Sequence, residues 1–260
     1  MTVVAASGRV FHRNWLVYKR LWHRSLAFGF LQPLLFLTAM GVGLGALISS
    51  RQQAAAFGGV PYIDWLGPGL LAAMAMQTAT FESTYPIMNK IMWGRNYEAM
   101  LSTPVEIRSI VRGELAWVGF RIGSLAAVFL VVLTVFGIPR TPLAVLAVPV
   151  AMLVGVAFSA CLMAFTATQR NDVGFSAVFR FVVNPLFLFS GTFFPLSQLP
   201  PQLQAVAWAT PLFHGVELIR GLILGQLNLL AAPIHLAYLV AMLVIGVLLA
   251  DRYLTRRMAS

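Results

Sequence analysis

The chain has 260 residues, of which 59% are hydrophobic and only 10% are charged, and its formal net charge is +10. A soluble domain is usually about one-quarter charged, so this composition indicates a protein whose solvent is lipid. The positive charge does not indicate nucleic-acid binding, because the basic residues lie between long uncharged runs and not on one soluble face. The single cysteine, Cys161, excludes a disulfide framework or a Cys-based metal site within one chain.

Six apolar segments are long enough to cross the hydrocarbon core of a bilayer, which needs about 20 mostly apolar residues. The predicted spans are residues 25–48, 63–88, 104–136, 143–168, 176–195 and 230–250. Backbone polar groups in the hydrocarbon must be paired internally, which favours a bundle of helices for spans of this length. The sequence therefore predicts an all-α polytopic membrane protein with one transmembrane domain, residues 1–260.

The basic residues predict the orientation of the spans. With a cytosolic N-terminus, the inside segments carry fourteen Lys and Arg residues and the outside segments carry three. Cytosolic loops are enriched in basic residues, so both termini are expected on the cytoplasmic side of the membrane.

Residues 9–24 are predicted to form an amphipathic helix ahead of the first span. Four aromatic side chains follow i, i+4, i+7, i+11 spacing on one stripe, with arginines opposite: Phe11, Trp15, Tyr18 and Trp22. This pattern suits a helix in the headgroup plane, with its cations on lipid phosphates. The alternative is a cytosolic flank that merely follows the bias in basic residues.

The loop between the second and third spans is predicted to contain a short cytosolic helix, residues 96–102. Three apolar side chains fall on one side of this helix and would form a knob: Tyr97, Met100 and Leu101. Pro104 ends the segment, and residues 103–106 read as a capping box that starts the third span with Pro104 at its first position. A rigid helix of this kind suits the transmission of force from a partner, and an ordinary interfacial turn is the alternative.

Residues 184–221 form the second irregular region. Residues 181–216 are uncharged, but prolines prevent one continuous helix. We expect the fifth span to end near Pro195 and two short helices, residues 198–222, to split at Pro211 and to dip into the outer leaflet under a cover of protein. Glu217 and Arg220 lie three residues apart and are expected to form an ion pair.

Three ionisable residues lie nearest the predicted hydrocarbon: Glu82, Glu114 and Arg121. Such residues usually mark function or an internal pair. We interpret them as a structural network at the inner mouth, and contact with a substrate headgroup, gating or a proton relay are the alternatives. His214 and His235 lack carboxylate neighbours at ligand spacing, so the sequence predicts no metal site, no catalytic residue and no cofactor in this chain.

Two segments resemble a known family. Residues 95–104, Arg-Asn-Tyr-Glu-Ala-Met-Leu-Ser-Thr-Pro, resemble the cytoplasmic loop of type-2 ABC exporter (ABC-2) permeases, and residues 184–221 resemble the signature before that family's last span. Residues 97–101 and 113–117 are similar to the permeases of nodulation lipooligosaccharide exporters, with daunorubicin-type drug exporters as a neighbouring branch.

The resemblance implies the permease subunit of an ATP-driven exporter that moves a lipooligosaccharide, a lipid-linked glycan or a hydrophobic drug. It implies a second permease copy in a homodimer, contact with membrane lipids and the amphiphilic substrate, and two ATP-binding subunits that bind ATP and Mg. The short cytosolic helix would be the coupling helix in the ATPase groove, with Arg95, Asn96, Tyr97, Glu98, Met100 and Leu101. The re-entrant pair would cap the exit, with Pro195, Pro200, Pro211, Glu217 and Arg220.

ATP hydrolysis is not expected in this chain. A phosphate-binding loop has the pattern Gly-x-x-x-x-Gly-Lys-Ser/Thr, and neither Lys19 nor Lys90 has that context. A proton-coupled secondary transporter of a hydrophobic substrate is the alternative, but it would favour broken helices in two repeats, and one broken region is present. A membrane enzyme would need a nucleophile–base pair or clustered His and Asp residues, which the sequence does not offer.

Overall fold

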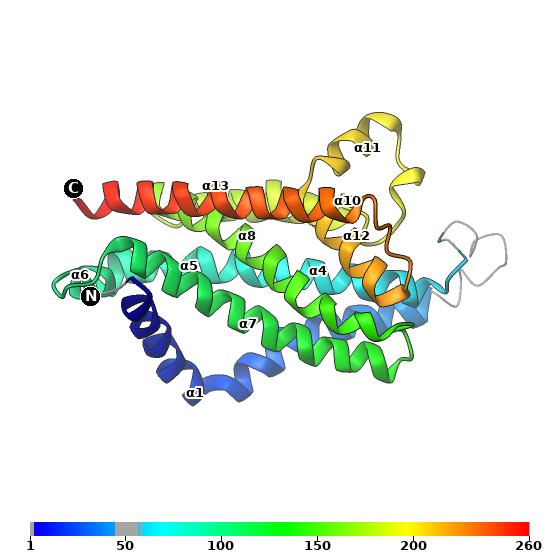
Figure 1. Ribbon diagram of the computed structural model, residues 1–260, viewed down its shortest axis with the longest axis horizontal. Coiled ribbons are helices and arrows are strands. Elements are labelled where there is room, and N and C mark those ends of the chain that lie inside the picture. Colours follow the sequence, from blue (N-terminus) through cyan, green and yellow to red (C-terminus); the bar gives the residue numbers. More distant parts are fainter. Residues whose placement is uncertain (1–2, 45–56, 58, 260) are drawn as a thin grey trace.

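The computed structural model describes residues 3–44, 57 and 59–259, and all regular structure within them is helical. Residues 45–48 of the first predicted span, and the side chains of residues 21–30, including Trp22, lie outside this description. The long helices run along the long axis of the molecule (Figure 1). The two termini and α6 lie at one end of the molecule, and α11 lies towards the other (Figure 1).

Three segments of the described chain are long and apolar enough to cross a membrane: Ile107–Val135, Pro142–Thr168 and Ala232–Ala259. They correspond to α7, to the 3-10 helix η3 (Pro142–Leu146) with α8 (Ala147–Thr168), and to α13. They match the third, fourth and sixth predicted spans, although α13 continues nine residues beyond position 250.

The N-terminal helix α1 spans Val3–Phe36 and continues into the π-helix η1, Leu37–Leu44. Its aromatic stripe does not lie free at a surface. Three rings of the stripe pack against Trp117 and Phe120 of α7, with centroids 5.4 to 5.8 Å apart, in mostly edge-to-face arrangements: Phe11, Trp15 and Tyr18. Aromatic contacts with α7 therefore cover much of this stripe, and the placement of the helix in the headgroup plane stays a prediction.

The second predicted span is a broken rod that consists of α4 (Tyr62–Ser83), α5 (Tyr85–Met88) and the π-helix η2 (Asn89–Trp93). The break follows from Pro86, which cannot donate a backbone hydrogen bond in the first turn of α5. Two residues of α8 satisfy the polar groups at the break. The Thr166 hydroxyl donates to the Ser83 carbonyl at 2.7 Å, and the Ser83 and Ser159 hydroxyls are 2.6 Å apart.

The predicted capping box before the third span is wrong. Helix α7 begins at Ile107, and Glu106 occupies its N-cap position without a side-chain hydrogen bond. The Thr103 hydroxyl instead donates to the Met100 carbonyl at 2.6 Å. Thr103 therefore belongs to the turn that follows α6, and the backbone is extended at Glu106 just before α7.

Helix α8 packs against α4, α7 and α13. A Cβ atom at Gly155 would clash with Ile122 Cδ1 and lie 3.1 Å from the Ala75 carbonyl oxygen, so a larger residue would require Ile122 and α4 to shift. Small residues at helix crossings in membrane proteins allow such close approach. Helix α8 thus holds α4 and α7 at fixed positions.

In the last third of the chain, a glycine and several prolines set the boundaries of the helices. The segment predicted as the fifth span consists of α9 (Val173–Val178), the π-helix η4 (Phe179–Val183) and α10 (Asn184–Phe189). It ends six residues before Pro195, since the chain turns at Gly191 with a φ of +80°. Two further helices lie on either side of the Pro211 break: α11 (Pro201–Trp208) and α12 (Pro211–Leu224).

Candidate functional site

Helix α6 spans Asn96–Leu101 between η2 and α7. It begins after Arg95, whose φ of +44° is the one positive value at a non-glycine residue in the described part of the chain. This left-handed step turns the chain sharply from η2 into α6. The Glu98 and Ala99 side chains are exposed, and Arg95 lies 3.8 Å from Glu98 in a solvent-accessible ion pair.

Tyr97 points into the protein and is fully buried. It belongs to an apolar cluster at this end of the bundle, with partners on α5, η2 and α7 that include Ile87, Ile91, Ile110 and Leu115. Met100 and Leu101 are partly buried and pack against the same cluster. The expectation of an apolar knob that projects outwards is therefore wrong: the apolar side of α6 anchors it, and its polar side is exposed.

The Tyr97 hydroxyl and the Oε1 atom of Glu114 make no hydrogen bond of good geometry among the described residues, although the two side chains interact with each other. Burial, together with the negative charge of the nearby Glu114, holds the pKa of Tyr97 well above its ordinary value. Tyr97 is therefore neutral at physiological pH and acts here as a packing residue.

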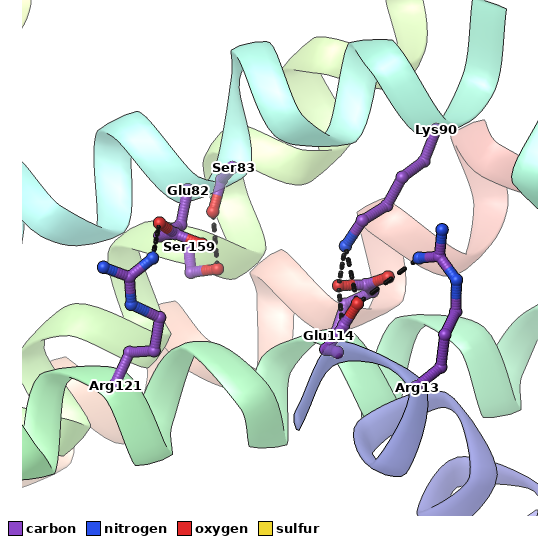
Figure 2. A network of polar contacts seen from close by, with 8 residues as sticks. Arg13, Glu82, Ser83, Lys90, Glu114, Arg121 and Ser159 are labelled. Carbon is purple, nitrogen blue, oxygen red and sulfur yellow. Dashed lines mark hydrogen bonds and ion pairs between the residues drawn. The ribbon is translucent and has the colours of Figure 1, made fainter. Parts of the chain in front are cut away.

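Glu114 of α7 lies at the centre of a buried polar cluster (Figure 2). The Lys90 ammonium donates to Glu114 Oε2 at 2.6 Å, and the Asn14 amide donates to the same oxygen at 2.9 Å. Lys90 also donates to Asn14 Oδ1 at 3.2 Å, and Arg13 donates to that oxygen at 3.4 Å. The cluster joins α1, η2 and α7, and η2 leads directly into the start of α6.

Glu82 and Arg121 form a second pair, which joins α4 to α7 beside the Ser83–Ser159 contact (Figure 2). The Arg121 guanidinium also lies 5.5 Å from the centroid of the Tyr18 ring of α1. The structure thus brings Glu82 and Arg121 together and places Glu114 in a separate cluster. The Glu82 and Glu114 carboxylates are both largely buried. A buried charge is costly unless it is paired, and each of the two carboxylates has a cationic partner.

At the other end of the molecule, Arg220 of α12 is buried and connects three elements. Its Nη2 atom donates to the Gly191 carbonyl at 2.8 Å, and its guanidinium stacks 3.7 Å from the centroid of the Trp65 ring of α4. The expected contact with Glu217 is present at 3.3 Å. Of the other predicted cap residues, Pro195 and Pro200 flank the short turn before α11, and Pro211 starts α12.

Several site contacts were missed by sequence reasoning. Lys90 and Asn14 were not assigned to the polar cluster, although Asn14 lies on the same side of α1 as the aromatic stripe. His214 and His235 were treated as isolated, yet their Nδ1 atoms are 2.6 Å apart and both rings are buried. No group of three or more potential metal ligands occurs among the residues that the structure describes.

Comparison with known proteins decides the family. Residues 8–224 match the model of the ABC-2 type transporter family. The chain belongs to this family. The match includes both segments that carried the resemblance, and ABC-2 proteins are membrane permeases that work as transport subunits. The ABC-2 assignment is thus confirmed over most of the chain.

The relatives of this ABC-2 permease include nodulation proteins. The chain is 32% identical over 249 residues to nodulation protein J of Rhizobium meliloti (strain 1021), covering 96% of this chain and 92% of the relative. Nodulation protein J of Rhizobium leguminosarum bv. trifolii has the same identity and coverage. The inner membrane transport permease YadH of Escherichia coli (strain K12) is 25% identical over 231 residues, 86% of this chain and 88% of the relative.

Proposed function

We propose that this ABC-2 permease is the membrane-spanning subunit of an ATP-driven exporter, and that α6 is its coupling helix. The placement of α6 supports this proposal: it exposes Glu98 and Ala99 on one side and inserts Tyr97 into the protein on the other. Because protein interiors are close-packed and transmit strain, a partner that displaces α6 also displaces the helices around Tyr97.

The polar cluster extends this connection beyond Tyr97. Lys90 lies on η2, which leads directly into α6, and its ammonium is held by Glu114 of α7 and Asn14 of α1. A movement of α6 therefore acts on α1 and α7 together. We propose that ATP-driven closure of the partner pushes α6 and that these helices open a path for the substrate.

The proposed topology has six spans with both termini in the cytoplasm of a bacterial cell. The excess of basic residues in the inside segments supports it, as does the position of α6 at the same end as both termini (Figure 1). The start of α1 would lie along the inner surface of the membrane. Helices α11 and α12 would re-enter the outer leaflet and cap the exit, with Arg220 fixing α12 to α4 and Gly191.

The proposed assembly contains two permease copies and two ATP-binding subunits, and the latter bind ATP and Mg. The proposed cargo is an amphiphile of the lipooligosaccharide, lipid-linked glycan or hydrophobic drug class. The similarity of the permease to nodulation protein J over 96% of the chain favours the lipooligosaccharide class. Cargo would pass along the interface between the two permease copies.

The test is transport in proteoliposomes that contain the permease with an ATP-binding cassette protein, sought first among the products of neighbouring genes. We expect flux of the amphiphile only with ATP, and we expect Glu98→Ala to reduce flux while ATP hydrolysis continues. Glu106→Ala, which removes the same charge from an exposed residue outside α6, is the matched control and should transport normally. Transport by the permease alone, driven by a proton gradient without ATP, would contradict the proposal and support a secondary transporter.

A further inference from the structure

A basic groove lies between the first turns of α7 and the last turns of α13. It is an open hollow with a volume of about 580 Å³. Four arginines line it, two from each helix: Arg108, Arg112, Arg252 and Arg256. Asp251 is the one acidic residue among the lining residues, so the groove carries a clear excess of positive charge.

The groove continues an apolar face of α13. Exposed aliphatic side chains run along this helix, and they include Val244, Ile245 and Leu248. Leu248 is 63% exposed and also lines the groove. Arg252 and Arg256 follow Leu248 at i+4 and i+8, so the apolar row and the arginines share one side of the helix.

The distance between the aliphatic row of α13 and the arginines of the groove fits an amphiphile. Four residues of α-helix, from Leu248 to Arg252, rise about 6 Å. An acyl chain on the aliphatic row would therefore place a charged headgroup directly among the arginines. A soluble acidic protein could contact the arginines but would have no reason to contact Leu248.

We propose that this groove binds one anionic phospholipid, with its phosphate among the four arginines and an acyl chain along the exposed face of α13 that ends at Leu248. Arginine binds phosphate oxygens through paired N–H groups, and basic pockets between transmembrane helices hold anionic headgroups. The Asp251 carboxylate lies beside the phosphate position and limits the affinity. The inference needs only the membrane location of the permease and does not depend on the role of α6.

The test is native mass spectrometry of the purified full-length permease in detergent, titrated with phosphatidylglycerol or phosphatidylcholine. We expect wild-type protein to retain phosphatidylglycerol in preference. The double variant Arg252→Gln/Arg256→Gln should bind it about thirtyfold more weakly, since each basic residue at a membrane surface contributes about fivefold. The control variant Arg170→Gln/Arg180→Gln removes two exposed arginines that do not line the groove and should bind like wild type.

A second variant guards against simple misfolding. Asp251→Asn removes the carboxylate and should tighten phosphatidylglycerol binding severalfold, an effect that damage to the fold would not produce. The proposal is overturned if both double variants lose lipid equally, if phosphatidylcholine binds as well, or if deacylated glycerophosphoglycerol competes as strongly as the intact lipid. Crosslinks that place an acidic protein partner in the groove would also overturn it.

Discussion

Lys90 of η2 and Glu114 of α7 form an ion pair of 2.6 Å in which the Glu114 side chain is 1% exposed and the Lys90 side chain 13% exposed. The pair ties the segment that leads into α6 to the helix that follows it. This pair is more buried than the ion pair between Asp64, in the first turn of α4, and Arg140. Those two side chains are 2.8 Å apart, and that of Arg140 is 43% exposed.

Removing one member of the buried pair should strongly destabilise the permease. Lys90→Met leaves the Glu114 carboxylate buried without its cation, which costs about 3 to 5 kcal/mol. Thermal unfolding in detergent should show a large drop for Lys90→Met and a smaller one for Lys90→Met combined with Glu114→Gln. Asp64→Asn, at the more exposed pair, should cost less than about 1 kcal/mol. Equal losses at the two pairs would argue against a central role for Glu114.

Tyr97 should tolerate loss of its hydroxyl but not of its ring. Tyr97→Phe removes a hydroxyl that makes no hydrogen bond of good geometry among the described residues and should change stability by less than about 1 kcal/mol. Tyr97→Ala leaves a cavity in the cluster at this end of the bundle and should cost about 3 to 5 kcal/mol. Denaturation of the two variants beside wild type measures this difference, and a harmless Tyr97→Ala would contradict the buried placement.

The raised pKa of Tyr97 predicts a specific alkaline instability. At neutral pH the phenol is protonated in both folded and unfolded chains and makes no difference. Above the ordinary pKa of about 10, the unfolded chain releases this proton while the folded chain retains it. Stability should therefore fall as the pH rises, by up to about 1.4 kcal/mol per pH unit from this group. Tyr97→Phe should lack this component when both proteins are unfolded between pH 9 and 11, and identical slopes would contradict it.

Gly69 should be intolerant of a side chain because it lies against the Thr192 backbone and the buried Arg220 guanidinium. A Cβ atom there would lie 2.9 Å from the Thr192 carbonyl oxygen and 3.2 Å from Arg220 Nη2. Gly69→Ala should therefore cost about 1 to 3 kcal/mol. Gly8→Ala is the control, since a Cβ atom there meets nothing within 4 Å in another helix. It should leave stability unchanged or raise it by about 0.5 to 1 kcal/mol, and thermal unfolding of both variants gives the comparison.

Local rules account for part of this structure. The helix break at Pro211 and the contact between Glu217 and Arg220 depend on residues close in sequence, so their spacing could predict them. The direction of Tyr97 could not be predicted in this way. Its spacing with Met100 and Leu101 shows that they share a side of α6, but only the packing of η2 and α7 decides that this side faces inwards.

Contacts between distant segments were beyond sequence reasoning. The Lys90–Glu114 pair and the His214–His235 contact bring together residues that are 24 and 21 positions apart. The Arg220–Gly191 hydrogen bond depends on the turn after α10, which ends earlier than Pro195 suggests. Each of these contacts follows from helix packing, which a single sequence does not specify.

The most direct test of the coupling role of α6 is site-specific crosslinking in the assembled transporter. In a Cys161→Ala background, Ala99→Cys places a thiol on the exposed side of α6. Gln202→Cys places an exposed thiol on α11, near the other end of the molecule. We predict that only Ala99→Cys crosslinks to the ATP-binding subunit, with a yield that changes when ATP is added. A crosslink from Gln202→Cys, or none from Ala99→Cys in an active complex, would contradict the coupling role of α6.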